Sequence, residues 1–220
     1  MENFRRSWVN TTHDWSAHVD VAHLARIQQN PDEFTPGRPW HLLLEVLAHS
    51  ADEAASRGGG NCLVTFHPDG SLSVRDDGRG TDTRVDEHHR LVKKPVISTK
   101  DLRFFDFPDA ELLPDGHPRR GMSVVAALSE WLVHTNRRRN GAWTQRYEYG
   151  IPTSGLEPIE ADGTTGTLVH FTTAEPQRPI ATPTQEQLQQ LAKPWPALRV
   201  EIDDRRAARE TQQEPTGTHL

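Results

Sequence analysis

The sequence is poor in cysteine and has no long apolar run, and these absences exclude several classes of protein. Cys62 is the only cysteine among the 220 residues, so no disulfide can form within the chain. No apolar stretch is long enough to span a membrane, and residues 1–10 lack the apolar segment of a secretory signal. We therefore expect a cytoplasmic protein with no membrane partner.

An excess of positive charge is also missing. The chain has 25 Lys and Arg against 31 Asp and Glu, which gives a formal net charge of -6. This balance argues against a protein that coats nucleic acids, so we do not expect the chain to bind DNA alone. Hydrophobic residues make up 34% of the sequence, and 220 residues suffice for one domain with a sizeable core.

Composition divides the chain into three parts. Residues 1–35 form a polar arm with a short amphipathic helix expected over 19–29, and proline and glycine interrupt the chain after it. The domain is expected over residues 36–204. Residues 205–220 form a polar tail.

The periodicity within the domain predicts an α+β fold. A strong amphipathic helix is expected over residues 40–57, ended by the glycines at 58–60, and an Asp-Gly turn at 69–70 joins two β-prone runs. Further elements are expected as a helix at 121–131, strands at 132–135 and 143–149, a hairpin ending in 166–171, a helix at 184–192 and a strand at 198–202. This order predicts a two-layer α/β sandwich, with helices on one face of a mixed sheet.

Four segments carry residues suited to a ligand site. They are HLLLEVLAHSADEA (41–54), DGSLSVRDDGRG (69–80), GMSVVAALSEWL (121–132) and TGTLVHF (165–171). In this order they resemble the ATPase domain of gyrase B and topoisomerase IV subunits, within the GHKL superfamily and its Bergerat fold. The resemblance covers about residues 20–204 and implies a domain that binds ATP or ADP.

Asp76 ends the second β-prone run, where its carboxylate could accept a hydrogen bond from an exocyclic amine. Gly78 and Gly80 follow it and allow the backbone to approach a ligand closely. A simple Asp-Gly turn is the alternative. The resemblance implies that Asp76 binds the adenine and that Thr167 supports it through a bound water.

Glu45, His49 and Asp52 are spaced i, i+4 and i+7, so they share one face of the predicted helix. A solvated polar face is the alternative. The resemblance implies that Glu45 activates the attacking water, with His49 and Asp52 near the nucleotide. His49 stands where the family has a magnesium-binding asparagine, and magnesium prefers oxygen ligands. The use of Mg, or of any metal, therefore stays open.

The segment before the helix at 121–131 also departs from the family. There the family's glycine-rich lid presents backbone N–H groups to phosphates, whereas this chain has Pro118, Arg119 and Arg120 before Gly121. We expect Arg119 and Arg120 to bind phosphate through their side chains, with a solvated charge pair as the alternative.

Two further arginines are candidates for contacting an aminocoumarin-type inhibitor. Arg79 and Glu53 match an ion pair at the family's pocket wall, and Arg138 matches a family arginine that contacts these inhibitors. A solvated hairpin loop, or a basic patch touching DNA, is the alternative for the run 137–139.

The resemblance implies a nucleotide-binding protein that hydrolyses ATP slowly or not at all. Nothing after residue 204 matches the family's transducer or DNA-cleaving domains, so we expect at most a weak ATPase, without topoisomerase activity alone. The alternative is a pseudo-ATPase that regulates a partner such as gyrase or binds an antibiotic. A kinase of the same superfamily is a third hypothesis. By analogy with gyrase B, residues 1–35 are expected to support a homodimer.

Overall fold

The computed structural model describes residues 12–13, 18–35, 40–105, 110–174 and 183–206. Most of the expected polar tail and the first eleven residues of the expected arm lie outside these ranges. None of the helices in these ranges combines the length and apolarity needed to cross a membrane.

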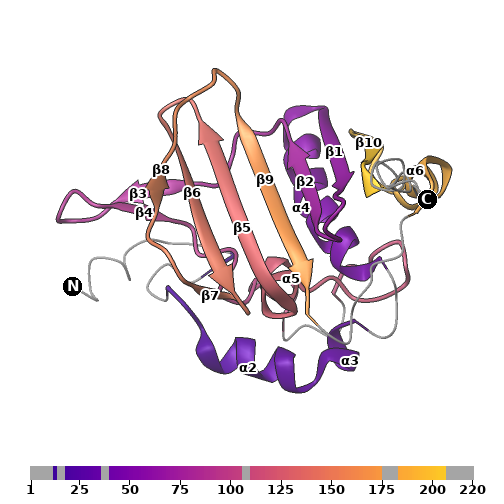
Figure 1. Ribbon diagram of the computed structural model, residues 1–220, viewed down its shortest axis with the longest axis horizontal. Helices are drawn as coiled ribbons and strands as arrows, with labels where there is room; N and C mark the ends of the chain where they lie inside the picture. The colour runs from indigo at the N-terminus through magenta and orange to yellow at the C-terminus, as the bar shows by residue number, and fades with distance from the viewer. Residues whose placement is uncertain (1–11, 14–17, 36–39, 106–109, 175–182, 207–220) are drawn as a thin grey trace, which may run out of the picture.

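A mixed sheet forms one layer of the molecule (Figure 1). Its strands lie in the order β10, β1, β2, β9, β5, β6, β7, and β8 pairs with β6. These strands are β1 (Gly60–Phe66), β2 (Leu72–Asp76), β5 (Ser129–Arg138), β6 (Gly141–Glu148), β7 (Ile151–Pro152), β8 (Glu157–Pro158), β9 (Gly166–Thr173) and β10 (Leu198–Asp204). The strands β1 and β10 run parallel, whereas the other pairs described in this sheet are antiparallel.

The helices form the second layer. In Figure 1, α4 (His41–Arg57) and α5 (Met122–Ala127) lie behind the strands, and α2 (Val21–Gln29) and α3 (Pro31–Phe34) run along the lower end of the sheet. The remaining helix, α6 (Gln185–Leu191), contacts β10. This arrangement confirms the expected two-layer sandwich of a mixed sheet with helices on one face.

The central helix α4 forms because its apolar residues recur at helical spacing. Leu43, Leu44 and Leu47 are fully buried against the sheet. Gly58 ends the helix in the left-handed conformation, with φ 78°, as the sequence predicted. The face of α4 that carries the predicted site residues is therefore fixed by the packing of its leucines.

The helix α2 packs on the same core as α4. Leu24 and Ile27 are buried in it, together with Phe34 of α3. Asp20 begins α2 as its N-cap and accepts a hydrogen bond from the backbone N–H of His23. The helical part of the expected arm thus contributes apolar side chains to the domain.

Several expected element boundaries are wrong. The predicted helix over 121–131 stops at Ala127, because the chain from Ser129 onward pairs with β9 as strand β5. The same strand continues through Arg138, so the arginine run begins in the sheet and not in a loop.

The expected last hairpin is also wrong. Strand β9 lies between β2 and β5, far from its neighbours in the sequence, and pairs antiparallel with both. Residues 81–117 are expected to be irregular, but part of this segment forms a two-stranded sheet of β3 (Thr83–Val85) and β4 (Leu91–Lys93). Long-range pairing placed β9, whereas β3 and β4 form a local hairpin.

Candidate functional site

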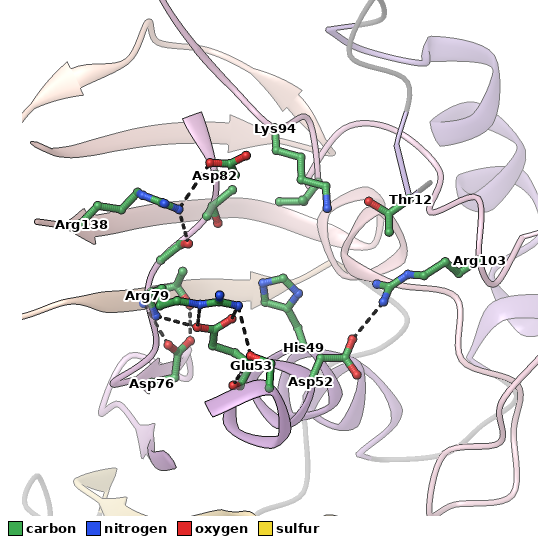
Figure 2. A pocket seen from close by; sticks show the side chains of 15 residues that line it. Thr12, His49, Asp52, Glu53, Asp76, Arg79, Asp82, Lys94, Arg103 and Arg138 are labelled. Carbon is green, nitrogen blue, oxygen red and sulfur yellow. Dashed lines mark hydrogen bonds and ion pairs between the residues drawn. The ribbon is translucent and has the colours of Figure 1, made fainter. Parts of the chain in front are cut away.

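A cavity of about 540 Å³ opens above α4, at the end of β2 (Figure 2). Its walls come from α4, from the loop after β2, from residues 94–103 and from the strands β5 and β9. The lining residues are Thr12, His49, Asp52, Glu53, Ser56, Asp76, Arg79, Gly80, Thr81, Asp82, Lys94, Val96, Arg103, Arg138 and Thr167. The cavity therefore brings together residues from most of the segments singled out in the sequence.

Asp76 forms the polar floor at one end of the cavity, where its side chain is 7% exposed. One carboxylate oxygen accepts hydrogen bonds from the backbone N–H groups of Gly78 (2.8 Å) and Thr167 (3.2 Å). The hydroxyl of Thr167 donates to the other oxygen, and Ser50 lies 3.5 Å from it. The structure thus places Asp76 and Thr167 in direct contact, as a fixed and partly satisfied acceptor at the cavity wall.

Glycines allow the close approaches around Asp76. A Cβ on Gly166, which has φ 128°, would lie 2.0 Å from the carbonyl oxygen of Asp76. Gly80, with φ 79°, passes so close to β5 that a Cβ would lie 2.6 Å from the Asn136 side chain. Gly78 lies under the side chain of Glu53 and does not line the cavity. Sequence reasoning did not identify Gly166 as a site residue, although it lies in the TGTLVHF segment.

The two arginines predicted at the rim are both held by the protein. Arg79 forms a bidentate ion pair with Glu53, at 2.7 and 3.0 Å, which is the pair expected from the sequence. Its side chain is 64% exposed, so the pair by itself adds little stability. Arg138 donates to the carbonyl of Gly80 (2.9 Å) and lies 3.7 Å from Asp82. Both guanidinium groups line the cavity from the side nearest Asp76 (Figure 2).

His49 and Asp52 project from α4 into the cavity, as their shared helix face predicted. Burial lowers the pKa of His49, so its imidazole is neutral at pH 7. Asp52 receives two guanidinium groups, from Arg119 at 2.8 and 3.0 Å and from Arg103 at 3.3 Å. Partial burial alone would raise the pKa of Asp52, but the hydrogen bonds and charge of Arg119 hold it below its usual value.

The two arginines before α5 do not line the cavity. The side chain of Arg119 is 3% exposed and packs on the Phe104 ring, 4.3 Å from its centroid, while it pairs with Asp52 and Glu111. The guanidinium of Arg120 donates to the carbonyl of Phe104. In this conformation neither arginine presents its side chain to a ligand in the cavity.

Glu45 is fully buried and lies outside the cavity lining. Its two carboxylate oxygens accept hydrogen bonds from the backbone N–H groups of Arg120 (2.6 Å) and Gly121 (2.8 Å) at the start of α5. Burial raises the pKa of Glu45 to about 7. His41 lies one helical turn earlier, 3.6 Å from Glu45, and its other ring nitrogen bonds Asp115 at 2.8 Å. The carboxylate therefore occupies the backbone N–H groups of Arg120 and Gly121, at the position where the resemblance places a phosphate-binding lid.

Sequence reasoning missed two cations of the cavity, Lys94 and Arg103. Both belong to the segment 81–117, whose lack of periodicity gave no indication of its position. The chain places Lys94 by a backbone hydrogen bond to the carbonyl of Asp82, and Arg103 by a bidentate bond to Asp101. In Figure 2 the Lys94 side chain comes from the wall opposite α4, whereas Arg103 enters from the side and reaches Asp52 of α4.

The oxygen atoms of the cavity are poorly suited to a divalent cation. Each carboxylate of the lining has a cationic or N–H partner, and His49 offers a neutral nitrogen. Magnesium prefers an octahedron of oxygen ligands. No group of three or more His, Cys, Asp or Glu residues with metal-binding geometry occurs in the described part of the chain. The residues present therefore do not fit the magnesium ion that the fold family implies.

Relatives of the chain occur among bacterial topoisomerase subunits. The gyrase B subunit of Thermotoga maritima is 33% identical over 173 residues, which cover 75% of this chain and 27% of that protein. The topoisomerase 4 B subunit of Bacillus subtilis is 38% identical over 135 residues, 60% of this chain and 20% of that protein. The chain thus spans between a fifth and about a quarter of the length of these relatives. No protein-family model matches the sequence.

A solved structure shows the same fold. It is the ATP-binding domain of topoisomerase IV from Francisella tularensis, in complex with a small-molecule inhibitor, with a TM-score of 0.64 and 24% identity. The match covers 82% of this chain and 89% of that domain. The chain is therefore homologous to the ATPase region of the gyrase B and topoisomerase IV B subunits over part of its length, and it has the fold of the topoisomerase IV ATP-binding domain.

Proposed function

We propose that this protein binds ATP or ADP in the cavity above α4, with the adenine at Asp76. The observation that carries the proposal is the arrangement of Asp76, which Thr167 and Gly78 hold at the cavity wall. An anionic carboxylate in this place accepts a hydrogen bond from an exocyclic amine, and a hydrogen bond to a charged acceptor is stronger than a neutral one. The homology to ATPase regions and the cavity volume support the same ligand class.

We also propose that hydrolysis is slow or absent. A general base must lie within hydrogen-bond reach of the water that it deprotonates, directly or through one other water. Glu45, the candidate base, is fully buried and bonded to the backbone of Arg120 and Gly121. Segment 119–121 would have to move before Glu45 could reach a water in the cavity. At most a weak ATPase activity is expected from this arrangement, and no topoisomerase activity from this chain alone.

A calorimetric titration tests the proposed function. Purified protein is titrated with ADP and with ATP, with magnesium and with a chelator, and the titration is repeated with Asp76→Asn. We expect the variant to bind roughly 10- to 100-fold more weakly, because an amide is a poorer acceptor than a carboxylate and presents an N–H to the amine. Absence of ADP and ATP binding to the wild type at millimolar concentration would refute the proposal.

A regulatory role is the second candidate, favoured by one observation. Arg119 is tied to Asp52 and Glu45 to the start of α5, so both groups are occupied within the fold. A pseudo-ATPase of this kind would act through a partner such as gyrase or would hold an aminocoumarin-type antibiotic beside Arg79 and Arg138. Novobiocin titration and co-purification with added gyrase test it. Neither binding nor a stable complex is the outcome against it.

We also propose that the nucleotide-binding protein forms a homodimer. Thr12, the first described residue, belongs to the expected arm and lines the cavity, so this part of the arm lies beside the ligand site. An arm that leaves the cavity wall could contact a second copy when nucleotide binds. The molecular mass in solution, measured with and without ATP, tests this, and a monomer in both states would contradict it.

A further inference from the structure

The wall of the cavity opposite α4 carries a positive group without a partner of its own. The ammonium of Lys94 makes no hydrogen bond or ion pair with any residue in the described ranges, whereas the other cationic side chains of the lining are all paired. Figure 2 shows the Lys94 side chain directed into the cavity, toward His49. Partial burial lowers the pKa of Lys94, because the wall removes water from the charge, and the nearby carboxylate of Asp101 offsets this only in part.

Arg103 adds a second cation, which enters the cavity from the side (Figure 2). Its guanidinium holds Asp101 through two bonds and reaches Asp52 at 3.3 Å, on the side of the cavity away from Asp76 (Figure 2). A ligand anchored at Asp76 would therefore direct its far end toward Arg103 and Lys94. Asp82 also lines the cavity near Lys94, and its carboxylate lies 3.7 Å from Arg138.

The opposite face of the cavity lacks the groups that a divalent cation needs. His49 supplies a neutral imidazole, and Asp52 is neutralised by Arg119 and Arg103. A fixed ammonium can instead offset phosphate charge, as Lys does at many phosphate sites. The attraction is strengthened where water is partly excluded.

We infer that the nucleotide's phosphates bind to Lys94, supported by Arg103, and that binding therefore requires no divalent cation. The inference rests on the proposed nucleotide function and specifies how this site holds the anionic end of the ligand. Lys94 takes the charge-neutralising place that a metal ion has in a magnesium nucleotide site. The metal-free nucleotide is then a sufficient ligand.

The test compares adenosine, AMP and ADP by calorimetry, each with excess EDTA and with millimolar magnesium. For the wild type we expect ADP to bind in EDTA, with an affinity within about threefold of that in magnesium. Lys94→Met is expected to weaken ADP binding by roughly 10- to 100-fold, the range for loss of a charged hydrogen bond, and adenosine binding by less than twofold. Lys94→Arg keeps the charge and should retain most of the ADP affinity.

Lys193→Met is the matched control. It removes the same charge from an exposed residue outside the cavity lining, so it should leave every affinity unchanged. Thermal melts establish that each variant is folded. Three outcomes would overturn the inference while the proposed function stands. ADP binding could disappear in EDTA, Lys94→Met could leave ADP binding unaltered, or Lys94→Met could weaken ADP and adenosine binding equally. Failure of the wild type to bind any of the ligands would refute the proposed function, and the inference with it.

Discussion

At the scale of single residues, two carboxylates predicted to act in the site have different surroundings. Asp76 lies at the cavity wall and accepts hydrogen bonds from Thr167 and from the backbone of Gly78. Glu45 is fully buried beneath the start of α5. The first is placed to contact a ligand, whereas the second stabilises the conformation of the segment before α5.

The protonation of Glu45 should appear in the stability of the protein. Burial raises its pKa from 4.5 to about 7, so the folded state binds the proton more tightly than the unfolded chain. Its contribution is complete below pH 4.5 and is lost as pH rises through 7, on the order of 3 kcal/mol in total. Urea unfolding between pH 4.5 and 8 should show this loss in the wild type relative to Glu45→Gln, which does not titrate.

The comparison between the wild type and Glu45→Gln uses the change in the free energy of unfolding with pH, and not its absolute value. The amide of Glu45→Gln would place an N–H against one of the two backbone donors, which adds a constant cost. Two stability curves that remain parallel across this pH range would show that Glu45 does not titrate as proposed.

At the scale of elements, the loop after β2 is fixed by its contact with β5. Asn136 accepts a hydrogen bond from the backbone N–H of Thr81 at 2.6 Å, and Arg138 bonds the carbonyl of Gly80. The loop that lines the cavity is therefore held by a strand that lies 50 to 60 residues later in the sequence.

Gly80→Ala should destabilise the protein by about 3 kcal/mol or more, because the new Cβ has positive φ and would collide with Asn136 and the Arg137 carbonyl. Gly163→Ala is the control, since Gly163 has φ 78° but open space around it, and should cost only about 1 kcal/mol. Denaturant unfolding measures both. Equal losses would mean that the loop moves freely away from β5.

Helix α2 should contribute substantially to stability. Leu24 is 1% exposed within the core, so Leu24→Ala should lower the free energy of unfolding by about 2–5 kcal/mol. Val21 lies on the same helix but is 63% exposed, and Val21→Ala should change it by about 0.5 kcal/mol or less. Chemical unfolding of both variants checks this. A small effect of Leu24→Ala would indicate that α2 detaches from the domain.

At the scale of the whole molecule, the single cysteine reports on cooperative unfolding. Cys62 lies in β1, is 2% exposed, and burial raises the pKa of its thiol far above the usual range. The thiolate that reacts with labelling reagents is therefore absent from the folded protein.

A thiol reagent should label Cys62 only when the sheet opens. We expect the labelled fraction in rising urea to follow the loss of circular dichroism, and saturating ADP to shift both transitions to higher urea by mass action. Rapid labelling without denaturant would show that β1 opens locally. A shift by ADP that is lost in Asp76→Asn would connect the stabilisation to the proposed site.

The sequence by itself determined the elements whose signals are local. The leucine spacing of α4 and Gly58 predicted that helix and its end, and the Asp-Gly turn predicted the β1–β2 hairpin with Asp76 at its close. The helix and the hairpin both depend on residues close together in the sequence, so a sequence shows their signals directly.

Only the tertiary structure decided what lies across from these elements. It placed β9 between β2 and β5, which brings Thr167 to Asp76. The residues expected to end the helix at 121–131 instead begin strand β5, because they pair with β9. The tertiary structure also directed Lys94 into the cavity and bonded Glu45 to the start of α5. These contacts join residues tens of positions apart, and their energies come from packing and pairing between elements, which local periodicity does not encode.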